Sequence, residues 1–141
     1  MTCTFFGHSS FTKNIYEQVR NEILQLIDSG VTSFYVGNNG QFDYTVQKVL
    51  ESISLKRSNF KYSIVLSRLS EAPLNGATSK TLFPEELECA MPRFAISKRN
   101  EWLISHSDIA ICFVAHTFSN SHKWLEKAKR KGLKIINLSS L

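Results

Sequence analysis

Short β-favouring segments alternate with amphipathic helical segments along most of the chain, and this alternation limits the folds that the chain can adopt. In the first helical segment, apolar residues recur at the spacings of one helix face, at Ile15, Val19, Ile23, Leu26 and Ile27. The expected strands are residues 2–6, 32–36, 61–66, 108–115 and 133–138. The expected helices are residues 15–29, 42–53, 93–105 and 121–131, so that each lies between two strands.

This order of elements indicates a mainly parallel sheet whose crossover helices cover both faces. We therefore predict an α/β fold, a three-layer Rossmann-like domain of about five strands. Residues 1–141 form it as a single domain, because 141 residues with 43% apolar side chains suit one core. Ligands of such folds bind at the carboxyl ends of the strands, where the strand order reverses. With the order 3-2-1-4-5, loops 7–10 and 116–121 face each other at that point.

Residues 67–92 form a long connection between two expected elements. The segment shows little periodicity, apart from a short helical piece at 84–88 that begins with Pro84. A connection of this length in a compact domain is typical of a segment that covers a site or is disordered.

The net charge of +5 comes from one part of the chain. Residues 123–134 hold six Lys and Arg side chains and one Glu, and the remaining residues are neutral in sum. Such a local excess is typical of a solvated helix face or of a helix carboxyl end, where cations complement the helix dipole. We therefore expect no specific DNA or RNA binding.

We find no segment that indicates membrane insertion or export. The longest apolar run is residues 109–115, whereas a spanning helix needs ~20 residues. No basic residue precedes the first apolar residues, as it would in a signal peptide. The cysteines, Cys3, Cys89 and Cys112, are widely spaced, which favours free thiols and offers no metal site. We predict a cytoplasmic protein without a membrane partner.

Three loops that follow strands are rich in residues that can present backbone N–H groups. At a helix N-terminus, unpaired N–H groups and the helix dipole both attract an anion, so a phosphate-bearing ligand is the natural guest. Ordinary turns use the same residues, and that alternative stays open. The candidate ligand-binding residues in these loops are Gly7, His8 and Ser9; Gly37, Asn38 and Gly40; and Thr117, Ser119, Asn120 and Ser121.

Arg99 lies on the same stripe of its expected helix as Ile96 and Leu103. A long cation on an apolar stripe is costly unless it is paired or points into a cleft. One reading is a salt bridge to a carboxylate such as Asp43 or Asp108, or a side chain that extends to solvent. The other reading is a guanidinium over a ligand phosphate.

Other charged residues of the two helices are further candidates. Lys98 falls between Ala95 and Trp102, and Asp43 is either a first-turn carboxylate of its helix or an acceptor for a ribose. The candidate ligand-binding residues of these helices are Asp43, Arg93, Lys98, Arg99 and Asn100. His8 and His116 can polarise a substrate, but no nucleophile–base pair and no carboxylate pair stands out, so we assign no catalytic residue.

Several longer stretches are similar to sequence motifs of a known protein family. Residues 34–43 run into an FDxxV pattern, and residues 93–100 read RFAIxxRN. Further stretches are residues 5–8, 84–88, 126–132 and 135–138. Together they span nearly the whole chain, and they resemble the DUF1273 (YpsA-like) branch of the SLOG superfamily.

The resemblance implies a Rossmann-like fold that binds nucleotides or nucleotide-derived ligands. The superfamily includes phosphoribohydrolases that activate cytokinins and sensors of ADP-ribose derivatives. Members that resemble this chain typically have Arg at the position of Ser9 and Gly-Gly at Ser119-Asn120, and the phosphoribohydrolase signature PGGxGTxxE is absent here.

We therefore expect a binding protein, a sensor or sequestering module, for a nucleotide-derived small molecule that contains phosphate or ADP-ribose. No other cofactor is implied. One alternative is a hydrolase that cleaves an N-glycosidic bond of such a ligand. A second alternative is a nucleic-acid-binding module that uses helix 121–131. A homo-oligomer is compatible with each of these functions.

Overall fold

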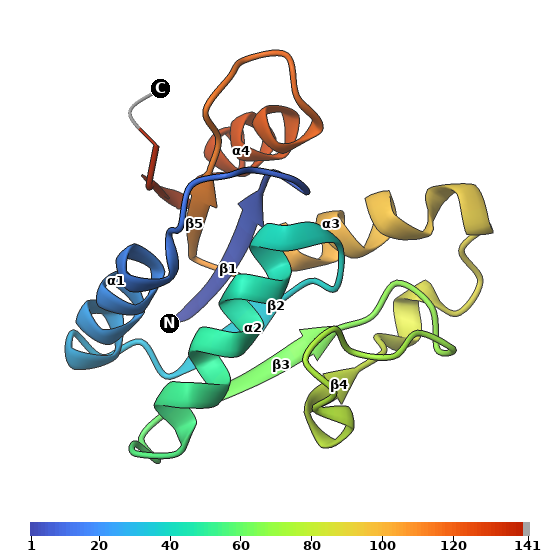
Figure 1. Ribbon diagram of the computed structural model, residues 1–141. Coiled ribbons are helices and arrows are strands. Elements are labelled where there is room, and N and C mark those ends of the chain that lie inside the picture. The colour runs from blue at the N-terminus through green and yellow to red at the C-terminus, as the bar shows by residue number, and fades with distance from the viewer. Residues whose placement is uncertain (140–141) are drawn as a thin grey trace.

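Six parallel strands form one sheet in the computed structural model, which describes residues 1–139 (Figure 1). They are β1 (Thr2–Gly7), β2 (Ser33–Val36), β3 (Lys61–Val65), β4 (Thr81–Leu82), β5 (Ile109–Phe113) and β6 (Lys134–Asn137). The order across the sheet is β4-β3-β2-β1-β5-β6, and all neighbours are parallel. The five expected strands are present in the expected order. The sixth strand, β4, is a two-residue edge strand within the long connection.

Four α-helices cover the two faces of the sheet, as the three-layer Rossmann-like fold requires. α1 (Tyr16–Asp28) and α2 (Gly40–Ser54) pack on one face, and α3 (Ala95–Ser105) and α4 (Asn120–Arg130) pack on the other (Figure 1). Short 3-10 turns lie at η1 (Thr78–Lys80), η2 (Glu85–Leu87) and η3 (Pro92–Phe94). None of the helices in residues 1–139 is both long and apolar enough to cross a bilayer.

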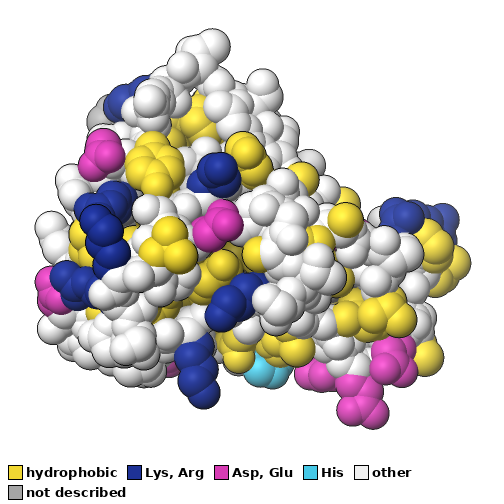
Figure 2. All heavy atoms as spheres, turned by 60° about the horizontal axis from the view of Figure 1, so that its bottom comes forward, with side chains coloured by type: hydrophobic (Ala, Val, Ile, Leu, Met, Phe, Trp, Pro, Cys, Tyr) yellow, Lys and Arg dark blue, Asp and Glu magenta, His cyan; other side chains and the backbone are white. Residues whose placement is uncertain are grey.

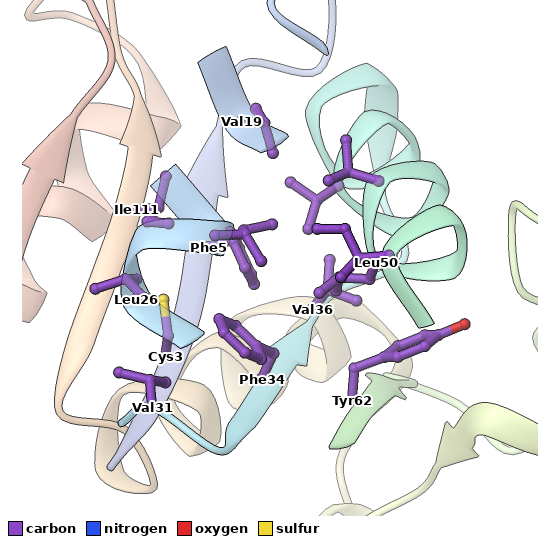
Figure 3. Close-up of a cluster of buried hydrophobic side chains, with 14 of the residues drawn as sticks. Cys3, Phe5, Val19, Leu26, Val31, Phe34, Val36, Leu50, Tyr62 and Ile111 are labelled. Atoms are coloured by element: carbon purple, nitrogen blue, oxygen red, sulfur yellow. The ribbon is translucent and has the colours of Figure 1, made fainter. Parts of the chain in front are cut away.

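Strands buried on both faces place alternate side chains in two separate apolar clusters. In β1, Phe5 points toward α1 and α2, whereas Phe6 packs against Trp124 of α4. Figure 3 shows Phe5 and Phe34 pointing from neighbouring strands toward Leu50 of α2. The stripe residues of both expected N-terminal helices are buried in this same cluster, which confirms their helical spacing.

The strand order reverses at β1, because the chain first adds β2, β3 and β4 on one side and then places β5 on the other. The loops after β1 and β5 meet there. The His8 N–H donates to the Phe113 carbonyl at 3.2 Å, and the Ala115 N–H donates to His8 Nε2 at 2.8 Å. The imidazole rings of His8 and His116 stack with their centroids 4.2 Å apart. The expected meeting of the two loops is confirmed.

Glycine is required at position 7 because α2 packs directly on the end of β1. A Cβ atom at this position would lie 2.3 Å from Phe42 Cγ, and the Phe42 side chain is completely buried. The absence of a side chain at Gly7 is therefore explained by the close packing of Phe42, without a ligand.

We expect Gly7→Ala to lower the free energy of unfolding by about 1–3 kcal/mol, the usual cost of overpacking a tight core. Urea denaturation followed by circular dichroism measures this change. Ser10→Ala, at an exposed position in the same loop, is the control and should change stability by less than about 0.5 kcal/mol. Equal stability of wild type and Gly7→Ala would show that Phe42 moves aside without cost.

Candidate functional site

A hollow of about 370 Å³ opens at the carboxyl ends of β1 and β2, bounded by α3 and the first turn of α4. We call it the Arg99 hollow. It brings together part of the set that the sequence predicted to bind ligand, namely Gly7, Ser9, Gly37, Asp43, Arg99, Asn100, Asn120 and Ser121. The lining residues outside that set are Phe5, Phe6, Asn39, Ile96, Ser97, Leu103, Lys123 and Trp124.

Arg99 is almost fully buried, with 2% of its surface exposed, and its hydrogen bonds all go to neutral oxygens. Nε donates to Asn100 Oδ1 at 3.0 Å. The two Nη atoms donate to the Val65 carbonyl and to Asn39 Oδ1, each at 3.3 Å. Burying a cation among neutral acceptors is costly, and none of the three acceptors of this guanidinium carries a charge.

The salt bridge that the sequence allowed for Arg99 is absent from residues 1–139, because no carboxylate there lies at ion-pair distance from the guanidinium. Asp108 instead accepts a hydrogen bond from the Thr2 N–H at 2.9 Å. Burial lowers the pKa of Arg99, and the more distant charges of Asp43 and Glu71 raise it by less. A guanidinium nevertheless stays protonated at neutral pH.

Gly37 lets Arg99 and Asp43 approach the end of β2 from two sides. A Cβ atom here would lie 2.7 Å from Asp43 Oδ2 and 3.1 Å from Arg99 Cζ. Only glycine leaves room for both charged groups against the backbone. The sequence predicted Gly37 as a ligand contact, and the structure adds that it makes space for the charged side chains of the site.

Burial raises the pKa of the Asp43 carboxyl to about 6, although the charge of Arg99 and the Asn39 N–H lower it. The Asn39 N–H donates to Asp43 Oδ2 at 2.9 Å, at the N-terminus of α2. The carboxyl group therefore gains or loses its proton just below neutral pH. It is also the only carboxyl group among the lining residues of the Arg99 hollow.

Three helices, α2, α3 and α4, place residues of their N-terminal ends in the lining of the Arg99 hollow. In α2, the Gln41 and Phe42 N–H groups donate to the Ser9 and His8 carbonyls. In α4, the Ser119 side chain caps the helix by accepting from the His122 N–H at 3.1 Å. The next two residues, Asn120 and Ser121, line the hollow, so the N-terminus of α4 is one of those that face it.

Some predicted residues serve the protein itself. His8 is buried and accepts the Ala115 N–H at Nε2, and Ser119 is the α4 cap. Gly40 has a φ of +83°, and a Cβ atom there would lie 2.6 Å from Ser9 Cα, so glycine is needed for the turn. None of these three residues lines the Arg99 hollow.

Three further predicted residues lie away from the hollow. Lys98 is exposed and pairs with Glu101 at 3.9 Å. Arg93 lies over the ring of Phe94. Thr117 is exposed in the loop after β5. Lys98 and Arg99 are neighbours in sequence but point to different sides of α3, as the helical period requires.

Asn38 belongs to a buried polar network that sequence analysis did not detect. Its side-chain amide donates to Glu71 Oε2 at 3.0 Å and to the Ala72 carbonyl at 2.9 Å. Its Oδ1 accepts from Gln47 Nε2 and from the Leu74 N–H. The network fixes residues 67–75 to the loop after β2. Both ends of the Asn38 side chain are thus used within the protein.

The cationic side chains of α4 are partly engaged by their own neighbours. Lys127 pairs with Glu101 at 3.4 Å and lies over the Trp124 ring, and Lys123 lies over the same ring. On the face drawn in Figure 2, Lys and Arg side chains stand in separate groups with Asp and Glu among them. Nothing on that face resembles the continuous basic surface typical of nucleic-acid binding.

The three cysteines are free thiols, and Cys89 is the exposed one. Cys3 and Cys112 are buried, and burial raises the pKa of the Cys112 thiol to about 12. Within residues 1–139, His, Cys, Asp and Glu side chains do not gather in groups of three that could hold a metal ion.

No protein-family model matches the chain, and no curated protein matches it with significant similarity. The resemblance to the SLOG superfamily therefore remains a prediction from the sequence stretches described above. The function proposed below is based on the fold and on the residues of the Arg99 hollow.

The contact between His8 and Ala115 makes the loop junction sensitive to acid. Burial and the neighbouring His116 lower the pKa of His8 below its ordinary value of 6.5. The unfolded chain then binds a proton more readily than the folded chain, so this residue's contribution to stability is lost as the pH falls below 6.5.

The Asp43 carboxyl acts in the opposite direction, because its raised pKa lets the folded chain take up a proton that the unfolded chain does not bind in this range. We therefore expect the change in the free energy of unfolding from pH 7 to pH 5 to favour the folded state more in His8→Gln than in wild type. Urea denaturation at several pH values measures this difference, with Ser10→Ala, an exposed substitution in the same loop that changes no ionisable group, as the control that keeps the wild-type pH dependence. An identical pH dependence in wild type and His8→Gln would contradict this role of His8.

Proposed function

We propose that this protein binds a nucleotide-derived small molecule whose phosphate lies in the Arg99 hollow, and that it acts as a sensor or a sequestering module. The observation that carries the proposal is the buried Arg99 guanidinium. It lines a hollow where the strand order reverses, and its hydrogen bonds go only to neutral oxygens. In residues 1–139, no carboxylate lies at hydrogen-bond distance from the Arg99 guanidinium. A ligand phosphate supplies the negatively charged acceptor that is missing.

The other side of the Arg99 hollow supports the same ligand chemistry. Lys123 adds a second cation, and the first turn of α4 offers backbone N–H groups at the positive end of its helix dipole. Phe6 and Trp124 form an apolar wall. A hollow with a cationic end and an apolar wall suits a phosphate ester better than free inorganic phosphate.

A second candidate function is hydrolysis of an N-glycosidic bond in such a ligand. The observation in its favour is Asp43, whose pKa of about 6 is suitable for accepting or donating a proton near neutral pH. The binding function is preferred because Asp43 Oδ2 already accepts the Asn39 N–H, and no second carboxyl group lines the hollow.

Binding of nucleoside 5′-monophosphates and ADP-ribose can be measured by isothermal titration calorimetry on wild type and on two pairs of variants. We expect Arg99→Ala to cost about 1.5–3 kcal/mol of binding free energy, the range for hydrogen bonds to charged groups. Arg99→Lys should also weaken binding, because lysine lacks the planar fork of donors. Lys123→Ala should weaken binding several-fold.

Lys129→Ala is the matched control for Lys123→Ala, because Lys129 is exposed on the same helix and outside the Arg99 hollow. Both lysine positions are exposed, so neither substitution should impair folding. Equal affinity of wild type and Lys123→Ala, together with full binding by Arg99→Lys, would reject the phosphate site. Release of free base during the titration would instead assign the hydrolase.

A further inference from the structure

We infer that the ligand of this protein is elongated, with its phosphate in the Arg99 hollow and an uncharged ring at its other end held by residues of the 67–92 connection. This inference rests on the proposed function and extends it, because it names the shape and orientation of the ligand. A nucleoside 5′-phosphate is the simplest compound with this shape.

Three hollows adjoin along the carboxyl edge of the sheet. The Arg99 hollow shares Asn39 and Ile96 with a middle hollow of about 450 Å³. The middle hollow shares Ser67, Arg68 and Glu71 with a third one of about 780 Å³, which we call the Phe83 hollow. The shared residues place the three hollows in a row from α4 to the long connection, and we call this row the track.

The charges along this track fix the direction of the ligand. The Arg99 hollow has two cations, Arg99 and Lys123, and one carboxylate, Asp43. The Phe83 hollow has one cation, Arg68, and two carboxylates, Glu71 and Glu88. A phosphate is therefore attracted to the Arg99 end and repelled from the Phe83 end.

Glu71 keeps its negative charge because the loop holds it with several donors. Its carboxylate accepts from the Ser67 and Arg68 N–H groups, each at 3.1 Å, and from the Ser67 hydroxyl. Burial alone would raise the pKa of Glu71, but the hydrogen bonds from Ser67 and Asn38 and the charge of Arg99 bring it below its ordinary value. The carboxylate is therefore a fixed feature of the track at neutral pH.

The Phe83 hollow also offers the apolar walls that a ring requires. Leu66, Phe83 and Leu87 line it from the sheet edge and from η2. Leu69, at its rim, is 75% exposed, and Ile96, at the junction of the other two hollows, is 43% exposed. Binding pockets for small molecules combine such apolar surface with a few polar groups. An uncharged planar ring, such as a nucleobase, fits this end.

The experiment compares ligands that share a phosphate end and differ in the ring. Ribose 5-phosphate and the four common nucleoside 5′-monophosphates are titrated into wild type, Leu69→Glu and Leu55→Glu. Leu69→Glu adds a charge at the rim of the Phe83 hollow. Leu55→Glu is the matched control, because Leu55 is 83% exposed at the end of α2 and lines none of the three hollows.

We expect at least one nucleotide to bind wild type about tenfold or more tightly than ribose 5-phosphate, which is the effect of burying part of a ring. Leu69→Glu should reduce this preference for the nucleotide and leave the affinity for ribose 5-phosphate unchanged. Leu55→Glu should have the same affinities as wild type. The inference is overturned if ribose 5-phosphate and every nucleotide bind with equal affinity, or if Leu69→Glu leaves the preference for a nucleotide intact. In either case the phosphate site itself is still supported. Binding of none of these phosphate esters would reject the phosphate site and this inference together.

Discussion

All six strands run in the same direction, so every connection has to cross a face of the sheet before the next strand can pair. β1 lies in the interior of the sheet although it comes first in the chain. The chain fills one side of β1 up to β4 and then returns along residues 83–108 to place β5 on the other side. This reversal separates the connections at the carboxyl edge, and the Arg99 hollow lies in the resulting space.

The chemistry of the Arg99 hollow follows from that geometry. The return segment carries α3 across the ends of β1 and β2, which places Arg99 over Gly37 with Asp43 close by. The polar network of Asn38, Gln47 and Glu71 fixes the loop after β3 to the same edge. The buried guanidinium is therefore held by hydrogen bonds to three parts of the chain, namely the loop after β2, the end of β3 and its own helix. A free loop would not hold a cation in this way.

Much of the fold could be predicted from the sequence, because buried helix faces and strands leave periodic apolar patterns. β4 was missed because a two-residue edge strand leaves no such pattern. In the site, the position of Arg99 on the stripe of Ile96 and Leu103 indicated that its cation needs a partner or a cleft; of that stripe Leu103 is buried, whereas Ile96 is 43% exposed. Whether its partner is a carboxylate or a ligand depends on contacts between distant residues, and no local pattern encodes them.

The same reason explains why Asn38 and His8 were interpreted differently from what the structure shows. Both lie in loops with the composition of an anion site, but their side chains bond to partners far away in the sequence, Glu71 and Ala115 respectively. Loop composition indicates where backbone groups are free to bind, and it does not tell which side chains the protein itself uses.

Nuclear magnetic resonance can show whether the Arg99 hollow binds a phosphate group. Adenosine 5′-monophosphate is titrated into the isotope-labelled protein while the backbone N–H signals and the Arg99 Nε–H signal are followed. With the phosphate in the Arg99 hollow, we expect the largest saturable shifts at Gly37, Asn120, Ser121 and Arg99 Nε–H. Shifts confined to the lysines at the carboxyl end of α4, or no shift at the Arg99 hollow at millimolar ligand, would contradict it.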